Sequence, residues 1–188
     1  MISKRSFEYC LTAWNVLKSN SYRWHEGLNT DAERSIARMF YQSVFDTSAE
    51  RTGLSTKPGA KYTDEGMTDD HYMAPQTVAK FIIESPKILN NYDKFEEIFL
   101  FCRRTIVVTK VENEALKELT KKQPVLTKDK YDYLDMKLYH GYEELPPINQ
   151  VLDVPKDFTE WESKFIKNSF RPTTVYVLKK SNLDNFFI

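Results

Sequence analysis

Hydrophobic side chains recur at helical spacing over much of the chain, and this period predicts most of its elements. The first predicted helix lies near the N-terminus, with a buried face made by Phe7, Cys10, Leu11, Trp14 and Leu17. A second helix follows Thr30, which forms a capping box with Glu33. Its buried face is predicted to be Ile36, Met39, Phe40 and Val44. Helical spacing returns over residues 76–84, and again from Ser85-Pro86 to Cys102.

Between and after these helices the period changes. Glycine and proline interrupt residues 52–67, which predicts a loop with at most one short strand, continuing to Pro75. Residues 105–108 are Thr-Ile-Val-Val, a β-branched run that predicts a strand. Thr109 and Glu112 then form a second capping box, so we expect a helix to follow this strand directly.

Beyond residue 124 the pattern is weaker. Short strands are predicted around Tyr131, Tyr133, Leu134 and Tyr139. A helix is predicted through Phe158, Trp161 and Phe165, and a terminal strand over residues 173–178. The whole pattern predicts an α+β chain, mostly helical, with an N-terminal helical region over 1–50, a core over 51–123 and a small C-terminal α+β lobe over 124–188.

The composition of the 188-residue chain indicates where in the cell the protein is located. No run of 18 or more apolar residues is present, so no membrane span is expected. Glu8, Asn15 and Lys18 interrupt the N-terminal apolar stretch, which therefore resembles an amphipathic helix more than a signal peptide. The two cysteines, Cys10 and Cys102, are too few for a disulfide framework. We therefore expect a reducing, cytoplasmic location.

Charge is balanced overall but unevenly distributed. The formal net charge is +0, with 27 basic and 27 acidic residues. Residues 62–100 carry three Lys/Arg and eight Asp/Glu, whereas residues 101–130 carry eight and four. An acidic segment beside basic ones suits a metal site flanked by phosphate-binding surface. It also suits an ordinary mixed surface, so both interpretations stay open.

One histidine stands out as a candidate for catalysis. Of the three histidines, only His71 directly follows an aspartate, Asp70. An imidazole can deprotonate a water that attacks a phosphodiester, while a divalent ion on a nearby carboxylate offsets negative charge. Asn113 lies away from the predicted buried stripe of its helix and can supply a second ligand. The structural alternatives are a hydrogen-bonded loop histidine, a turn-capping aspartate and an exposed helical asparagine.

The Asp-His pair, a later strand and the run Val-Thr-Lys-Val-Glu-Asn over residues 108–113 together resemble the HNH (ββα-metal) endonucleases. The resemblance is strongest to phage homing endonucleases, including a cyanophage group with an endonuclease VII type of site. It implies a ββα-metal core and hydrolysis of double-stranded DNA, in an infected bacterial host if the chain is phage-encoded. By this resemblance Asp70 and Asn113 would hold Mg²⁺ or Mn²⁺, and His71 would be the general base.

The resemblance also leaves choices open. The spacing from His71 to Asn113 is longer than in the compact motif, so residues 76–102 are predicted to be a helical insertion between the two strands. Asn90 and Asn91 are candidates for the middle asparagine of the motif by position alone. The candidate DNA contacts are Arg103, Arg104, Lys110, Arg34 and Arg38. The two arginine pairs can also be ordinary surface residues, and for Arg34 and Arg38 the solvated helix face is the favoured interpretation. The alternative function is a non-catalytic phage accessory protein that binds protein or DNA.

Overall fold

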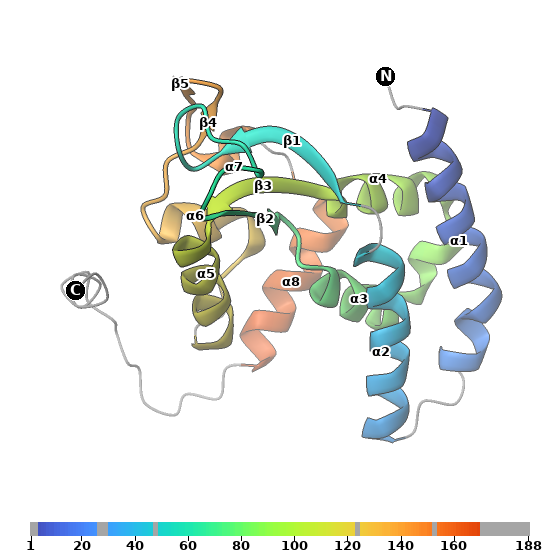
Figure 1. Cartoon of the computed structure of the whole chain (residues 1–188). Coiled ribbons are helices and arrows are strands. Elements are labelled where there is room, and N and C mark those ends of the chain that lie inside the picture. The colour runs from blue at the N-terminus through green and yellow to red at the C-terminus, as the bar shows by residue number, and fades with distance from the viewer. Residues whose placement is uncertain (1–3, 26–29, 47–48, 123–124, 152–153, 170–188) are drawn as a thin grey trace.

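The structure is a computed structural model that describes residues 4–25, 30–46, 49–122, 125–151 and 154–169 (Figure 1). Helices surround a five-stranded mixed sheet, so the predicted α+β class is confirmed. Within the described residues, no helix combines the length and the hydropathy that crossing a membrane requires.

A group of helices packs beside one end of the sheet. These helices are α1 (Lys4–His25), α2 (Asp31–Asp46), α3 (Pro75–Glu84), the 3₁₀ turn η1 (Pro86–Asn90) and α4 (Tyr92–Cys102). Their shared core is largely aromatic, and its fully buried members include Tyr41, Phe45, Phe81, Phe95 and Phe99. On α2 this core differs from the predicted face, because Ile36 and Met39 are 51% and 60% exposed. In their place, α2 buries Ala37, Tyr41 and Phe45.

The sheet has the strand order β2-β3-β1-β4-β5. Its strands are β1 (Glu50–Ser55), β2 (Met67–His71), β3 (Arg104–Thr109), β4 (Tyr139–His140) and β5 (Glu143–Glu144). β1 runs parallel to β3, whereas β2 runs antiparallel to β3 in a regular register from Met67 opposite Thr109 to His71 opposite Thr105. The Asp-His pair therefore lies in a strand, and the prediction of a loop there was wrong.

Strand β3 leads directly into α5 (Lys110–Lys122), as the sequence predicted. The capping box at this junction is present: the Thr109 amide donates to Glu112 Oε2 at 2.8 Å, and the Glu112 amide donates to Thr109 Oγ1 at 3.1 Å. The Thr56 hydroxyl donates to the same Glu112 oxygen at 2.6 Å. The first turn of α5 is thus tied both to its own cap and to the end of β1.

Replacing Thr109 by alanine is expected to lower the free energy of unfolding by about 1 kcal/mol, because the Glu112 amide loses its side-chain acceptor. Thr109→Ser keeps the hydroxyl and should cost much less. Urea unfolding of the two variants makes the comparison. Equal midpoints for alanine and wild type would show that the cap does not stabilise α5.

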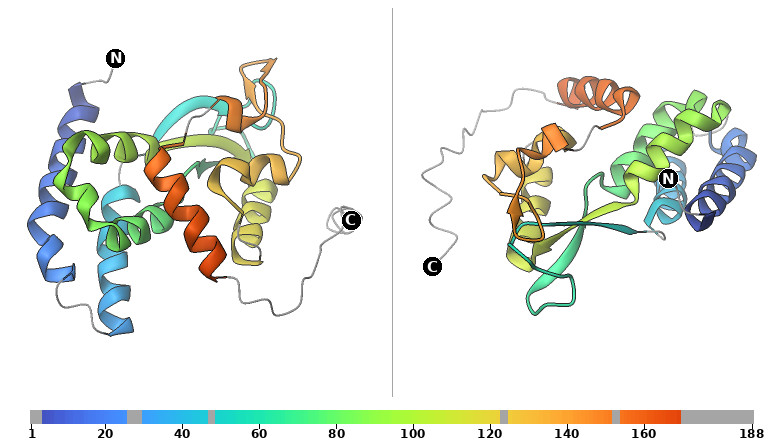
Figure 2. Two further views of the ribbon diagram at one scale, coloured as in Figure 1. Left: turned by 180° about the vertical axis from the view of Figure 1, so that it is seen from behind. Right: turned by 90° about the horizontal axis from the view of Figure 1, so that it is seen from above.

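The C-terminal part adds the 3₁₀ turn η2 (Thr127–Asp129), α6 (Lys130–Tyr133), α7 (Ile148–Val151) and α8 (Lys156–Ser169). α6 is a helical turn where Tyr131 and Tyr133 had suggested a strand, and its C-cap amide, from Leu134, donates to Tyr131 O at 3.1 Å. Around Tyr139 the predicted strand is present as β4, which pairs with β1. α8 packs on α3 (Figure 2). The predicted strand over 173–178 lies outside the described residues.

Candidate catalytic site around strand β2

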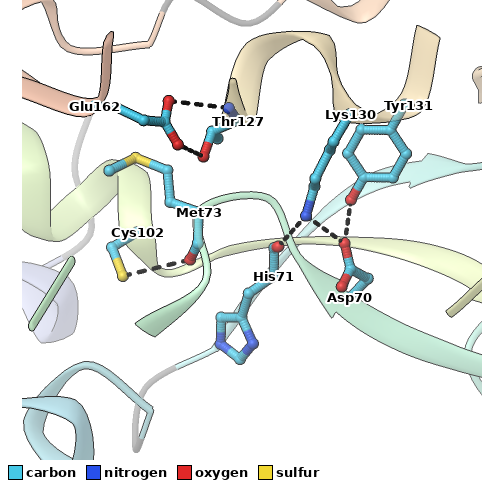
Figure 3. A network of polar contacts seen from close by, with 8 residues as sticks. All are labelled: Asp70, His71, Met73, Cys102, Thr127, Lys130, Tyr131 and Glu162. Carbon is cyan, nitrogen blue, oxygen red and sulfur yellow. Dashed lines mark hydrogen bonds and ion pairs between the residues drawn. The ribbon is translucent and has the colours of Figure 1, made fainter. Parts of the chain in front are cut away.

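Strand β2 presents its side chains alternately to two faces of the sheet. Because its register with β3 is regular, neighbouring side chains point to opposite faces. Asp70 therefore points to one face, and Asp69 and His71 point to the other. Figure 3 shows the His71 imidazole and the Asp70 carboxylate leaving the strand in different directions. The two residues that the sequence paired as one site are adjacent in the chain but separated by the sheet.

The carboxylate of Asp70 is bound by the helical turn α6 (Figure 3). Lys130 Nζ donates to Asp70 Oδ2 at 2.7 Å and to the backbone oxygen of His71 at 2.7 Å. The Tyr131 hydroxyl donates to the same carboxylate oxygen. The Lys130 and Asp70 side chains are only 8% and 16% exposed. This buried ion pair fixes β2 against α6.

A second buried carboxylate holds the segment before α6 in place. Glu162 of α8 accepts from the Thr127 amide at 2.9 Å and from the Thr127 hydroxyl at 2.8 Å. Burial raises the pKa of Glu162, and these two hydrogen bonds oppose the shift. Lys130 is thus presented to β2 by a turn that is itself attached to α8.

The imidazole of His71 lies on the opposite face in a largely desolvated position. Burial lowers its pKa below the ordinary histidine value, although the carboxylates of Asp46, Asp70 and Asp69 act against the shift. Burial thus favours the uncharged form of the ring. Its Nε2 atom is buried and has no hydrogen-bond partner. A neutral imidazole with an unpartnered ring nitrogen can take a proton from water.

Asp69 lies on the same face as His71 and was not predicted as a site residue. Its Oδ2 accepts from Arg51 Nε at 2.9 Å and lies 2.9 Å from Arg51 Nη2, whereas its Oδ1 is buried without a partner. The Arg51 guanidinium lies 3.3 Å from the centre of the Tyr62 ring. Once residues 67–71 are known to form a strand, the spacing Asp-x-His is the signal that places Asp69 beside His71.

The segments that carry Asp70 and Asn113 are neighbours in the fold. The Lys110 amide at the start of α5 donates to Gly66 O at 2.8 Å, and α5 packs against β2. The Asn113 side chain is partly buried. The ligand pair expected from the sequence, Asp70 with Asn113, meets one obstacle, because an ion on Asp70 Oδ2 would share that oxygen with the Lys130 ammonium. No three His, Cys, Asp or Glu side chains of the described ranges cluster as a metal site.

The predicted DNA-binding side chains fall into two groups. Arg103 is buried, lies 3.7 Å from Glu50 Oε2 through its Nη1, and packs near the Phe99 ring. Arg104 is partly buried with its guanidinium over Phe101. This placement favours a structural role for Arg103. The exposed candidates are Arg34, Arg38 and Lys110.

The two candidates for the middle asparagine lie at a helix boundary. Asn91 is the N-cap of α4, where its side chain accepts from the Lys94 amide at 3.1 Å. Asn90 is exposed at the end of η1. The cap accounts for Asn91 without any contact to His71.

Comparison of the chain with protein-family models, curated proteins and solved structures found no match. The side chains of β2 and their surroundings are therefore the basis for assigning a function.

Proposed function

We propose that the protein is a metal-dependent DNA endonuclease of the HNH type, which hydrolyses a phosphodiester bond with His71 as the general base. The observation that carries this proposal is the buried and unpartnered Nε2 of His71, on a strand that also bears two carboxylates. Phosphodiester hydrolysis needs a group that takes a proton from the attacking water and a cation that offsets negative charge.

The order of the surrounding elements supports the same proposal. β2 pairs antiparallel with β3, and β3 runs straight into the capped helix α5. The helices α3 and α4 lie between the two strands, as the insertion that the long spacing from His71 to Asn113 requires. Strand, strand and helix thus follow in the order that a ββα-metal core requires.

Exposed cations adjoin this arrangement and can bind phosphates. Arg51 lies in β1, Lys57 and Lys61 follow it in the connection to β2, and Lys110 begins α5; all four are exposed. Each phosphate contact made by such a side chain releases counterions, so DNA affinity should fall steeply with salt.

The cation of the proposal is Mg²⁺ or Mn²⁺. When bound, it would offset charge on the scissile phosphate and on the leaving oxygen. The unpartnered buried oxygen of Asp69 fits an oxygen-preferring cation, and by the family resemblance Asp70 and Asn113 would be its ligands. On Asp70 the ammonium of Lys130 disfavours an ion at Oδ2, because two positive charges would share one oxygen.

A supercoiled plasmid tests the proposal. Wild type is expected to nick or linearise it with Mg²⁺ or Mn²⁺, and EDTA should stop the reaction. The variant His140→Ala removes an exposed histidine of β4 and should leave the rate unchanged. A plasmid that stays intact under all these conditions would refute the endonuclease.

The second candidate is a non-catalytic accessory protein that binds protein or DNA. It is favoured by the Asp70–Lys130–Tyr131 network, which gives Asp70 a structural role, and by the exposed apolar side chains Ile36 and Met39 of α2. An intact plasmid that is retarded in a gel would support DNA binding alone, and an intact plasmid without retardation would support a protein partner.

A further inference from the structure

We propose that Asp69, not Asp70, is the carboxylate that binds a divalent cation beside His71. This inference deepens the proposed endonuclease and rests on it for its purpose, but the cation site can be tested without DNA. The proposed ligand is Asp69, which lies on the same face of the sheet as the His71 imidazole, in place of Asp70, the aspartate that the resemblance to HNH endonucleases implies.

Strand geometry separates the two aspartates. Asp69 and His71 are two positions apart in a regular strand, so they point to the same face, whereas Asp70 points to the other. Same-face neighbours on a strand are roughly 6.6 Å apart. An oxygen–cation contact of roughly 2.1 Å, a bound water and a hydrogen bond of roughly 2.8 Å span such a gap. The strand spacing of the two residues is therefore of the length that a carboxylate-bound cation and its water bridge.

Two buried atoms without hydrogen-bond partners also lie on this face of β2. Asp69 Oδ1 and His71 Nε2 are both buried, and neither has a hydrogen-bond partner. Buried polar atoms in proteins nearly always have one, because an unpartnered atom has lost its water without replacement. A ligand bound on this face of the strand would give both atoms a partner. A hydrated divalent cation satisfies both. The carboxylate oxygen of Asp69 binds the cation, and a water on the cation donates a hydrogen bond to His71 Nε2.

The cationic partners of Asp69 and Asp70 also favour Asp69 as the cation ligand. Arg51 contacts only Oδ2 of Asp69, and its side chain is 49% exposed, so solvent screens its charge. Lys130 is 8% exposed and shares Asp70 Oδ2 with the Tyr131 hydroxyl. Arg51 thus leaves Asp69 Oδ1 without a partner, whereas the charge of Asp70 is neutralised by a buried ammonium.

Titration of the full chain with Mn²⁺ in the absence of DNA tests the assignment. The EPR signal of free Mn²⁺ measures how much of the ion is bound. Asp69→Asn is expected to weaken Mn²⁺ binding by about tenfold or more, since loss of even an outer-shell partner commonly costs 10- to 100-fold. Asp70→Asn should bind Mn²⁺ nearly as wild type does. Circular dichroism of each variant establishes that it is folded.

Arg51→Gln is the matched control, because it removes the same ion pair as Asp69→Asn but keeps the carboxylate. Mn²⁺ should bind this variant at least as tightly as wild type, since a neighbouring positive charge is gone. If Asp70→Asn fails to fold, the comparison of Asp69→Asn with Arg51→Gln decides the question by itself.

The outcomes separate this inference from the proposed function. Mn²⁺ binding that is lost in Asp69→Asn but kept in Arg51→Gln supports the site, even if no plasmid is cleaved and the endonuclease fails. Mn²⁺ binding that persists in Asp69→Asn overturns the site, even if the wild type cleaves DNA. Absence of Mn²⁺ binding by the wild type also overturns it.

Discussion

Replacing His71 by alanine is expected to lower the rate of plasmid cleavage by about 10²- to 10⁴-fold, the usual contribution of a general base. The loss follows from removal of the unpartnered ring nitrogen that would accept the proton of the attacking water. Initial rates of nicking at saturating Mg²⁺ measure the effect. Added imidazole should restore part of the rate, because it can occupy the space that the missing ring leaves and act as the base.

His140→Ala is the control for this experiment, since it removes an imidazole from an exposed strand of the same sheet. Circular dichroism and thermal unfolding should show that His71→Ala retains the fold. A folded His71→Ala variant that cleaves at the wild-type rate would exclude His71 as the base.

Replacing Lys130 by methionine is expected to lower the free energy of unfolding by about 3–5 kcal/mol, as is usual when one partner of a buried ion pair is removed. The change leaves the Asp70 carboxylate buried with only the Tyr131 hydroxyl, and it removes the donor to the His71 backbone oxygen. Urea unfolding measures it. The double variant Asp70→Asn/Lys130→Met should be less destabilised, because no unpaired charge remains.

Lys128→Met is the matched control, two residues earlier. Its ammonium is 40% exposed and lies 3.5 Å from Asp129 Oδ1, so its loss should cost less than about 1 kcal/mol. Equal destabilisation by the Lys128 and Lys130 substitutions would show that the buried ion pair does not hold β2 in place.

Elements set by neighbouring residues were predictable from the sequence. Both capping boxes are present, because Thr30 with Glu33 and Thr109 with Glu112 need only a helical turn to meet. The predicted helix over 76–84 and strand over 105–108 are confirmed as well. These segments have local signals that the tertiary structure reinforces.

Elements set by distant contacts were not predictable. β2 contains Asp69, Asp70 and His71, which disfavour strands, and it exists because β3 pairs with it across an insertion of two helices. α6 bears two tyrosines that suggested a strand, but Lys130 and Tyr131 bind a carboxylate some 60 positions away in the sequence.

The residues of the candidate site also include some that the sequence could identify and some that it could not. His71 could be singled out because histidines are rare in this chain and because an aspartate precedes it. Asp69 and Arg51 could not be singled out, since their significance depends on strand alternation and on the pairing of β1 with β3. The burial of Arg103 beside Glu50 could not be predicted, because no local pattern in the sequence reveals it.

Strand β2 is the outermost strand of the described sheet, so one side of its backbone faces away from β3. The His71 carbonyl lies on that outer side, because His71 alternates with Asp70 and Tyr72, and it is covered by the Lys130 ammonium. Exposed edges recruit further strands, and buried or charged groups along the edge prevent this. Lys130 therefore blocks pairing of another chain with the edge of the sheet at His71.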